Sequence, residues 1–371
     1  MKLLKMKGLA ITHKGIEDIT SLEISEILGS KIKVKESCVE FDVSNYEDIA
    51  KICYFGQSII KVLNLFKSFK IDSLEDIDKN ISSCLKSIKE FITPKRSFAV
   101  RALIEENSDF ETDEVCIEVA DSMKLDNKVD LKNPDVILFV YIYKDNCYIG
   151  IDFAGEDLSK RDYRIYTHYE ALKATKAYAM IRVADYCGSG VMLDPFCGSG
   201  TILIEAAIHA KKLSQNYYSK DKFAFLNYLD IDLEEFDSFE KVDGKIIGYD
   251  IEMRHVVAAR KNAKIAGVEK EIDFSKVEIE WLDTKFDEGT VDFIITNPPN
   301  KSHKNEKKIE KLYLNFFEKA AFILADNGNV TLITKSYDMI KKAAVAKGFK
   351  IEEEKTVRTG EDDFKIVKFV K

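Results

Sequence analysis

Residues 191–207 read VMLDPFCGSGTILIEAA, and this stretch decides the fold of the carboxyl-terminal half of the chain. An apolar run ends at Asp194, a glycine-bracketed turn follows, and a second apolar segment begins at Thr201. This order predicts a buried strand, a tight turn and the first turn of a helix. Gly198 and Gly200 permit positive φ values, so that a ligand can lie against the main chain. The first amides of the helix then point at that ligand.

The same stretch departs from two other nucleotide-binding motifs. A dinucleotide-binding turn requires a third glycine where Leu203 stands, and a P-loop requires a lysine after Gly200. The sequence D-P-F-C-G-S-G-T instead resembles motif I of the class I S-adenosylmethionine (SAM) methyltransferases. A turn that joins a strand to a helix without any ligand is the alternative.

This resemblance implies a Rossmann-like α/β domain with a seven-stranded sheet whose last hairpin is antiparallel. It also implies SAM as the cofactor, held by the glycine turn and by residues at other strand ends. The residues expected to bind it are Leu172, Asp194, Phe196, Cys197, Gly198, Ser199, Gly200, Thr201, Asp250, Ile251, Asp283, Thr284 and Asn297.

Two further apolar segments end in acids that suit a nucleoside. Residues 246–251 predict a strand that ends at Asp250, whose carboxylate can accept hydrogen bonds from both ribose hydroxyls. Residues 277–284 predict a third strand, and the methyltransferase resemblance implies that Asp283 accepts from the adenine amino group. Asp250 alone also suits an NAD-binding enzyme, and Asp283 alone also suits an ordinary turn.

Residues 291–300, VDFIITNPPN, indicate the class of reaction. The N-P-P at the end of this apolar strand resembles motif IV of methyltransferases that act on planar exocyclic nitrogens. The lone pair of such a nitrogen is delocalised and is a weak nucleophile. The side-chain oxygen of Asn297 and the carbonyl of Pro298 can hold both N–H groups, and Pro299 presets the backbone of Pro298. We therefore predict that Asn297, Pro298 and Pro299 act in catalysis, mainly by positioning.

The position after Pro299 departs from this motif. The family usually places Tyr or Phe there, followed by Gly, and the aromatic ring stacks on the extruded base. Here Asn300 precedes the lysine-rich run 301–308, which fits either phosphate binding or a solvated loop. Lys301 and Lys304 are the RNA contacts predicted in this run. Substrate and activity can therefore differ from those of the family.

The amino-terminal half predicts two small α+β units. Strand-like and helical patterns alternate in residues 1–60 as in a ferredoxin-like domain, and residues 59–69 continue a helical pattern. Residues 61–158 contain S-F-A-V-R-A, V-D-L-K-N-P-D-V and C-Y-I-G-I-D-F-A-G. These segments resemble successive pieces of a THUMP domain, an RNA-binding module of tRNA-modifying enzymes.

Basic residues at the end of the THUMP-like segment suit RNA. Lys160, Arg161 and Arg164 place three cations within five residues, beside Tyr163. Cations bind phosphates and an aromatic ring can stack on a base, so these four residues are predicted RNA contacts. Arg101 is a further one. A solvated charged loop explains the segment around residue 160 equally well.

Two connecting segments complete the domain organisation. Residues 159–170 are the expected linker to a methyltransferase domain at 171–371. The segment H-Y-E-A-L-K-A-T resembles the H-P-A-P-L-[KR]-x-T segment of this methyltransferase group with both prolines replaced, and we expect its Leu172 to line the cofactor pocket. Residues 211–244 are expected to form an insertion that covers an edge of the sheet.

Composition excludes several classes of protein. The 371 residues allow two or three domains with full cores. A net charge of −8 argues mildly against a nucleic-acid binder, although a basic face can coexist with an acidic remainder. No apolar run suits a membrane span, the lysine-rich start does not resemble a signal peptide, and seven scattered cysteines fit reduced thiols. We therefore expect a cytoplasmic monomer without membrane or metal sites.

Along nearly its whole length the chain resembles the THUMP-domain tRNA (guanine-N2)-methyltransferases, most closely those that modify position 6 of the acceptor stem. The resemblance implies transfer of a methyl group from SAM to the exocyclic N2 of a guanosine in tRNA. One alternative is a tRNA-binding protein with a SAM site and altered or lost catalysis. The other is a methyltransferase for a different amine, such as guanosine at position 10, adenine N6 or a glutamine amide.

Overall fold

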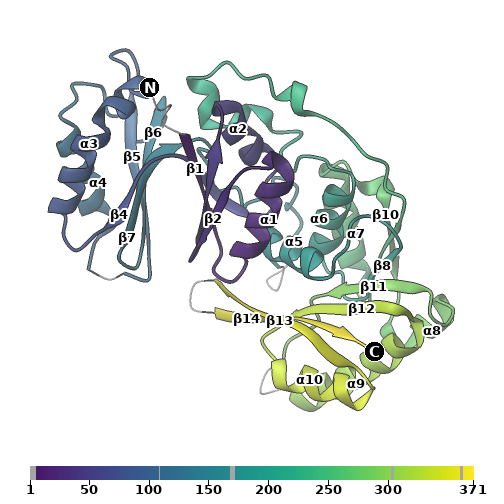
Figure 1. Cartoon of the computed structure of the whole chain (residues 1–371). Helices are drawn as coiled ribbons and strands as arrows, with labels where there is room; N and C mark the ends of the chain where they lie inside the picture. The colour runs from purple at the N-terminus through teal and green to yellow at the C-terminus, as the bar shows by residue number, and fades with distance from the viewer. Residues whose placement is uncertain (1–5, 108, 168–171, 302–304, 360–361) are drawn as a thin grey trace. The chain divides into compact units, whose positions relative to one another are not determined.

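The computed structural model describes residues 6–107, 109–167, 172–301, 305–359 and 362–371, and it divides into two compact units (Figure 1). The first unit comprises Met1–Thr12, Thr20–Leu158 and Ser219–Phe236. The second unit comprises His13–Ile19, Ser159–Tyr218 and Asp237–Lys371. Each unit is built around one seven-stranded sheet.

The sheet of the first unit is mostly antiparallel. Its strand order is β2-β3-β1-β4-β7-β6-β5; β5 and β6 run parallel, and the other neighbouring pairs run antiparallel. Its strands are β1 (Met6–Thr12), β2 (Ile32–Lys35), β3 (Cys38–Val43), β4 (Ile59–Lys70), β5 (Phe98–Glu105), β6 (Val136–Tyr143) and β7 (Asn146–Asp152). The helices in this part of the chain are α1 (Glu17–Leu28), α2 (Tyr46–Phe55), α3 (Glu75–Phe91) and α4 (Thr112–Met123). Segments 1–60 and 61–158 share this sheet, and the boundary between them stays a prediction.

Strand β6 is buried on both faces of this sheet, which explains its uninterrupted apolar sequence. Every residue of β6 is buried. Leu138 and Val140 join the hydrophobic cluster that includes the helices, whereas Phe139 and Tyr141 join a second cluster on the opposite face. Successive side chains of a strand point to opposite faces, so a strand covered on both faces shows no polar alternation.

The segment predicted to be helical at residues 59–69 forms strand β4 instead. The preceding helix, α2, ends at Phe55 with Gly56 as its C-cap, and the carboxylate of Glu23 then accepts from the backbone amides of Gln57 and Ser58 (2.6 and 3.1 Å). The apolar residues of this segment fit a helix and a buried strand alike. Antiparallel pairing with both β1 and β7 makes it a central strand of the sheet.

The predicted insertion at residues 211–244 is divided between the two units. Residues 219–236 belong to the first unit, where Phe223 and Phe225 stack with ring centroids 5.3 Å apart in its core. The amide of Phe225 donates to the carbonyl of Phe153 (3.2 Å). For residues 219–236 the prediction of a cover on the second sheet is therefore wrong, because their aromatic side chains are buried in the first unit.

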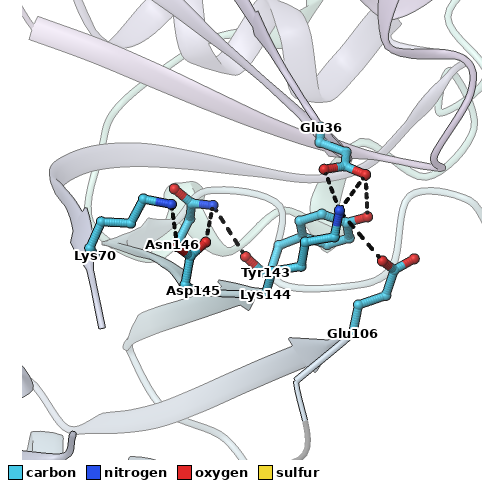
Figure 2. A network of polar contacts seen from close by, with 7 residues as sticks. All are labelled: Glu36, Lys70, Glu106, Tyr143, Lys144, Asp145 and Asn146. Carbon is cyan, nitrogen blue, oxygen red and sulfur yellow. Dashed lines mark hydrogen bonds and ion pairs between the residues drawn. The ribbon is translucent and has the colours of Figure 1, made fainter. Parts of the chain in front are cut away.

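A polar network links two hairpin turns of the first sheet (Figure 2). Lys144, in the β6–β7 turn, donates to both carboxylate oxygens of Glu36 (2.8 and 2.7 Å) in the β2–β3 turn. The Tyr143 hydroxyl also donates to Glu36 (3.0 Å), and the Lys144 ammonium lies 3.8 Å from the carboxylate of Glu106. The Lys144 and Glu36 side chains are each 43% exposed, so their ion pair is screened and contributes little free energy.

The second unit is a mostly parallel sheet closed by an antiparallel hairpin, which confirms the predicted fold class. Its strand order is β10-β9-β8-β11-β12-β14-β13, and β14 runs antiparallel to β12 and β13. Its strands are β8 (Val191–Asp194), β9 (Lys245–Asp250), β10 (Ile272–Lys276), β11 (Val291–Thr296), β12 (Leu324–Thr334), β13 (Lys350–Thr359) and β14 (Asp362–Val370). Its helices are α5 (Ala174–Val183), α6 (Thr201–Ala210), α7 (Met253–Ile265), α8 (Leu282–Lys285), α9 (Glu306–Ile323) and α10 (Tyr337–Ala346).

Residues 277–284 do not form the predicted third strand. Strand β10 lies earlier in the chain, and this segment contains a 3₁₀ turn, Ile279–Trp281, and most of the short helix α8. Ile279 and Leu282 are three residues apart and are buried in the same hydrophobic cluster. The buried residues of this segment are thus spaced as on one face of a helix, and not at every second position as in a strand.

Candidate active site

A cavity of about 700 Å³ in the second unit is lined by residues at the carboxyl ends of β8, β9 and β11. The strand order reverses between β8 and β11, and ligands of open α/β sheets bind at such a reversal. The volume falls within the usual range for small-ligand sites, about 300–1,000 Å³. The predicted cofactor residues that line this cavity are Leu172, Asp194, Phe196, Cys197, Gly198, Ser199, Thr201, Asp250, Ile251 and Asn297.

The glycine turn between β8 and α6 has the backbone conformation that its sequence predicts. Gly198 and Gly200 have φ values of 51° and 83°, and Gly200 is the N-cap of α6. A Cβ atom added at Gly200 would lie 2.9 Å from the Cβ of Ala259 in α7, so space as well as conformation excludes a side chain. Gly200 therefore serves the close packing of α6 and α7, while its neighbours line the cavity.

Asp194 ends β8 as a buried carboxyl group on the cavity wall. Its Oδ1 accepts from the Thr296 hydroxyl (2.5 Å) and from the amide of Phe196 (3.1 Å). Burial raises the pKa of Asp194 to about 7 even though these hydrogen bonds favour the charged form, and the nearby charge of Asp250 acts in the same direction as burial. Asp194 therefore changes its charge near neutral pH.

Asp250 ends β9 and is held beside the glycine turn. Its Oδ2 accepts from the amide of Gly198 (2.9 Å), and its Oδ1 accepts from the amide of Glu252 (2.8 Å) and lies 3.1 Å from Nδ1 of His255. A carboxylate offers about four acceptor positions, so it can accept further hydrogen bonds. Its predicted contact with ribose hydroxyls is compatible with this position and stays a prediction.

Asp283 and Thr284 lie elsewhere, contrary to their predicted place in the cofactor site. Both are in α8, where the Asp283 carboxylate pairs with Lys319 and the Thr284 hydroxyl donates to the carbonyl of Trp281 (2.8 Å). The acids of this segment that line the cavity are Glu278 and Glu280. Sequence reasoning missed both, because it placed the end of the third strand too late in the chain.

The N-P-P loop at the end of β11 is anchored to its neighbours. Asn297, Pro298 and Pro299 line the cavity, and the Tyr313 hydroxyl donates to the Pro299 carbonyl (2.6 Å). Among the described residues, the Asn297 side chain has no hydrogen-bond partner, so its amide is available to a ligand in the cavity. The loop thus combines a fixed backbone with a free side-chain amide.

Asn300, which replaces the usual aromatic residue, fastens this loop to the end of β12. Its Oδ1 accepts from the amide of Lys335 (3.0 Å) and from the Thr334 hydroxyl (3.3 Å). The next amide, of Lys301, donates to the Ser336 hydroxyl (3.1 Å). The structure thus gives Asn300 an anchoring role that depends on its side-chain carbonyl oxygen, an acceptor that a phenylalanine ring lacks.

Arg161 and Tyr163 are buried, which contradicts their predicted role as RNA contacts. The Arg161 guanidinium forms a two-point ion pair with Glu205 of α6 (Nε–Oε1 2.9 Å, Nη2–Oε2 3.1 Å). The Tyr163 hydroxyl donates to the same carboxylate (2.8 Å). Sequence reasoning missed Glu205 as the partner because the two segments lie 44 residues apart.

The other predicted RNA contacts have more exposed positions. Lys160 is exposed, Arg164 is half-buried, and the Arg101 guanidinium donates to the carbonyl of Gly155 (3.2 Å). Lys301 is exposed, and its ammonium lies 3.5 Å from the carboxylate of Glu306. Lys304 and residues 168–171 of the predicted linker lie outside the described residues.

The described ranges hold no candidate metal site, no membrane-spanning helix and no disulfide. Their histidines, cysteines and acids include no group of three or more that could hold a metal ion. Within those ranges, no helix combines the length and the apolar character needed to cross a membrane. None of the seven cysteines, all of which lie in those ranges, forms a disulfide.

The residues of the cavity fit SAM. Phe196, Ile251 and Ile279 offer apolar surface for a flat ring, and the carboxylates of Asp250 and Glu278 offer acceptors for hydroxyl and amino groups. The glycine turn leaves main chain accessible at the start of α6. These donors, acceptors and apolar surfaces are those that an adenosine with a charged amino-acid tail requires.

The chain matches two known protein families, and both matches confirm the resemblances seen in the sequence. Residues 161–364, more than half of the chain, match the family described as RMKL-like, methyltransferase domain. Residues 72–152 match the THUMP domain.

Relatives and solved structures agree with these matches. The tRNA (guanine(6)-N2)-methyltransferase of Methanocaldococcus jannaschii is 31% identical over 367 residues, which cover 93% of this chain and 95% of that protein. The Archaeoglobus fulgidus protein of the same name is 29% identical over 374 residues, covering 97% and 91% of the two chains.

Two crystal structures share the fold. TrmN from Thermus thermophilus superposes with a TM-score of 0.76 at 23% identity and 99% coverage of both chains. SMU.472, solved in complex with SAH, superposes with a TM-score of 0.81 at 22% identity, covering 100% of this chain and 99% of that one. The chain therefore belongs to the RMKL-like methyltransferase family and carries a THUMP domain ahead of its methyltransferase domain.

Proposed function

We propose that this protein transfers a methyl group from SAM to the exocyclic N2 of a guanosine in tRNA, at position 6 of the acceptor stem. The observation that carries the proposal is the N-P-P loop. It places the unpartnered Asn297 amide on the wall of a cavity that fits SAM. The two archaeal relatives, named as tRNA (guanine(6)-N2)-methyltransferases, support the choice of nucleotide.

The glycine turn and the strand-end acids would hold the cofactor. Gly198, Ser199 and Thr201 line the cavity with main chain and small side chains, and Asp250 stands beside them with its carboxylate fixed by backbone amides. When bound, SAM supplies a methyl group on a sulfonium centre, which an amine can attack directly. The protein then has to orient the amine and exclude water.

Asn297 and Pro298 would orient that amine. The exocyclic nitrogen of guanine shares its lone pair with the ring, so it attacks slowly unless it is held in a reactive geometry. The Asn297 side-chain oxygen and the Pro298 carbonyl can accept its two N–H groups. The Tyr313 hydroxyl holds the neighbouring Pro299 carbonyl (2.6 Å), which keeps the loop from shifting. This is catalysis by positioning and by hydrogen bonds that favour the reacting form of the nitrogen.

The same proposal includes tRNA as the partner and a cytoplasmic monomer. The THUMP match at residues 72–152 supports RNA binding by the first unit. Exposed Lys160 and Lys301, together with half-buried Arg101 and Arg164, are the described cations that we retain as tRNA contacts. The division into domains at 1–60, 61–158, 159–170 and 171–371 belongs to this proposal as well.

Asn297→Ala tests the proposed role of the loop. We expect methyl transfer to tRNA to fall by at least about 100-fold, as for the loss of one well-placed transition-state contact. The dissociation constant for SAM should stay within about threefold of wild type, because other residues make most of the cofactor contacts. Unchanged turnover would contradict the proposal. A loss of SAM affinity as large as the loss of methyl transfer would show that Asn297 binds the cofactor and not the substrate.

A second candidate function rests on Asn300. Without an aromatic residue at this position, the chain could bind tRNA and SAM yet transfer the methyl group slowly, or transfer it to another amine. Binding of both ligands without product would favour the first reading. Product on adenine N6, on guanosine at position 10 or on a glutamine amide would favour the second.

A further inference from the structure

Helix α9 presents two lysines to the cavity. Lys308 and Lys311 line it together with Asn315, and their spacing of three and four residues places all three on one face of the helix. Within the described part of the chain, neither lysine forms an ion pair. Lys319, on the same helix, differs because it pairs with Asp283.

The packing of α9 fixes where these lysines stand. Ile309, Tyr313 and Phe316 of this helix are buried on its inner face. The Tyr313 hydroxyl also bonds to the Pro299 carbonyl (2.6 Å), which ties the helix to the catalytic loop. Lys308 and Lys311 are therefore held beside the same cavity as the N-P-P loop, although both residues are exposed.

The acidic and basic side chains of the cavity come from different elements of the second unit. Its carboxylates are those of Asp194 and Asp250 at the ends of β8 and β9, of Glu252 just after β9, and of Glu278 and Glu280 after β10. Glu280 already accepts from the Asn315 amide (3.1 Å). The two lysines come from α9. Neither lysine has a carboxylate partner among the described residues, so both ammonium groups can pair with an anionic group of a ligand.

We propose that Lys308 and Lys311 bind a phosphate of the nucleotide that is extruded into the cavity. This inference rests on the proposed function, since it assigns the substrate side of the same site. An extruded base is usually held by stacking, but Asn300 has no ring and its side-chain oxygen is engaged by the end of β12. Phosphate contacts from α9 replace that stacking and hold the nucleotide in the cavity.

The test compares Lys308→Ala/Lys311→Ala with a matched control, Lys307→Ala. Lys307 is an exposed lysine of the same helix that is not among the residues lining the cavity. We expect the double variant to lose at least about tenfold in kcat/KM for tRNA, with SAM affinity unchanged. The slope of log kcat/KM against log salt concentration should fall by about 1. Lys308→Arg/Lys311→Arg should recover most of the activity, and Lys307→Ala should resemble wild type.

A binding readout separates this inference from the proposed function. Calorimetric titrations in saturating SAH compare guanosine 5′-monophosphate with guanosine. Wild type and Lys307→Ala should prefer the monophosphate by about tenfold, and the double alanine variant should show no preference. If wild type shows this preference but methylates no tRNA, the proposed function fails and the phosphate site stands. Equal or undetectable affinities of wild type for both ligands, or a double variant that retains the preference, would overturn the inference.

Discussion

Glu205→Gln tests whether Arg161 is a structural residue, as its burial indicates. The Arg161 and Glu205 side chains are 1% and 0% exposed, and two N–O contacts of 2.9 and 3.1 Å join them. Glutamine keeps the shape of Glu205 and an acceptor for the Tyr163 hydroxyl, but it removes the negative charge. The buried guanidinium then lacks a counter-ion, which costs about 3–5 kcal/mol of folding free energy.

Denaturant unfolding measures this cost. Trp281 is the single tryptophan of the chain and lies in the second unit, so its fluorescence follows the unit that contains the ion pair. We expect a lower midpoint concentration with an unchanged slope. Glu240→Gln is the control, because its pair with Lys212 is exposed (57% and 64%) and should contribute less than about 1 kcal/mol.

Two results would refute this reasoning. Glu205→Gln could be no more destabilising than the control, which would mean that the buried pair is not needed for stability. Alternatively, Arg161→Met could weaken tRNA binding without lowering the free energy of unfolding, which would restore Arg161 as an RNA contact. If the account is right, Arg161→Met combined with Glu205→Gln costs less than the sum of the two single changes.

Three further predictions concern charge, the loop anchor and the hairpin network. Burial raises the pKa of Asp194 to about 7, so the native state binds its proton more tightly than the unfolded chain does. Relative to Asp194→Asn, the free energy of unfolding of wild type should therefore fall as pH rises from about 4 to about 7, and then level off. Urea titrations at a series of pH values measure this dependence. Asn300→Ala should lower the free energy of unfolding by about 0.5–1.5 kcal/mol and slow turnover, because the amide of Lys335 loses its protein acceptor. Asn300→Asp should stay near wild type in thermal denaturation and in activity. Glu36→Gln should cost less than about 1 kcal/mol, and its effect should vanish in 1 M NaCl, because the Lys144–Glu36 pair is 43% exposed on both sides.

The parts of the site that could be predicted from the sequence are those built from consecutive residues. The glycine turn and the N-P-P loop each carry their geometry in a few adjacent residues, through positive φ at Gly198 and Gly200 and fixed φ at the prolines. The structure places both at one cavity. The antiparallel closing hairpin of the second sheet was implied by the resemblance to the class I methyltransferases, and the structure has it.

The errors have a different origin, because they depend on partners far away in the chain. Arg161 has the same local sequence whether it faces RNA or Glu205, and only the fold brings α6 to it. Residues 59–69 fit a helix or a buried strand until β1 and β7 pair with them. Lys308 and Lys311 stand in a run of lysines, and only the burial of the opposite helix face shows which of them point at the cavity.

The identity of the methylated nucleoside is the most direct test of the proposed methyl transfer to guanosine in tRNA. Unmodified tRNA is incubated with the full chain and with SAM carrying a labelled methyl group, then digested to nucleosides and separated by chromatography. We expect label in 2-methylguanosine, and we expect this label to be lost when position 6 of the tRNA is no longer guanosine. Label in another nucleoside, or no label although SAM and tRNA both bind, would contradict it.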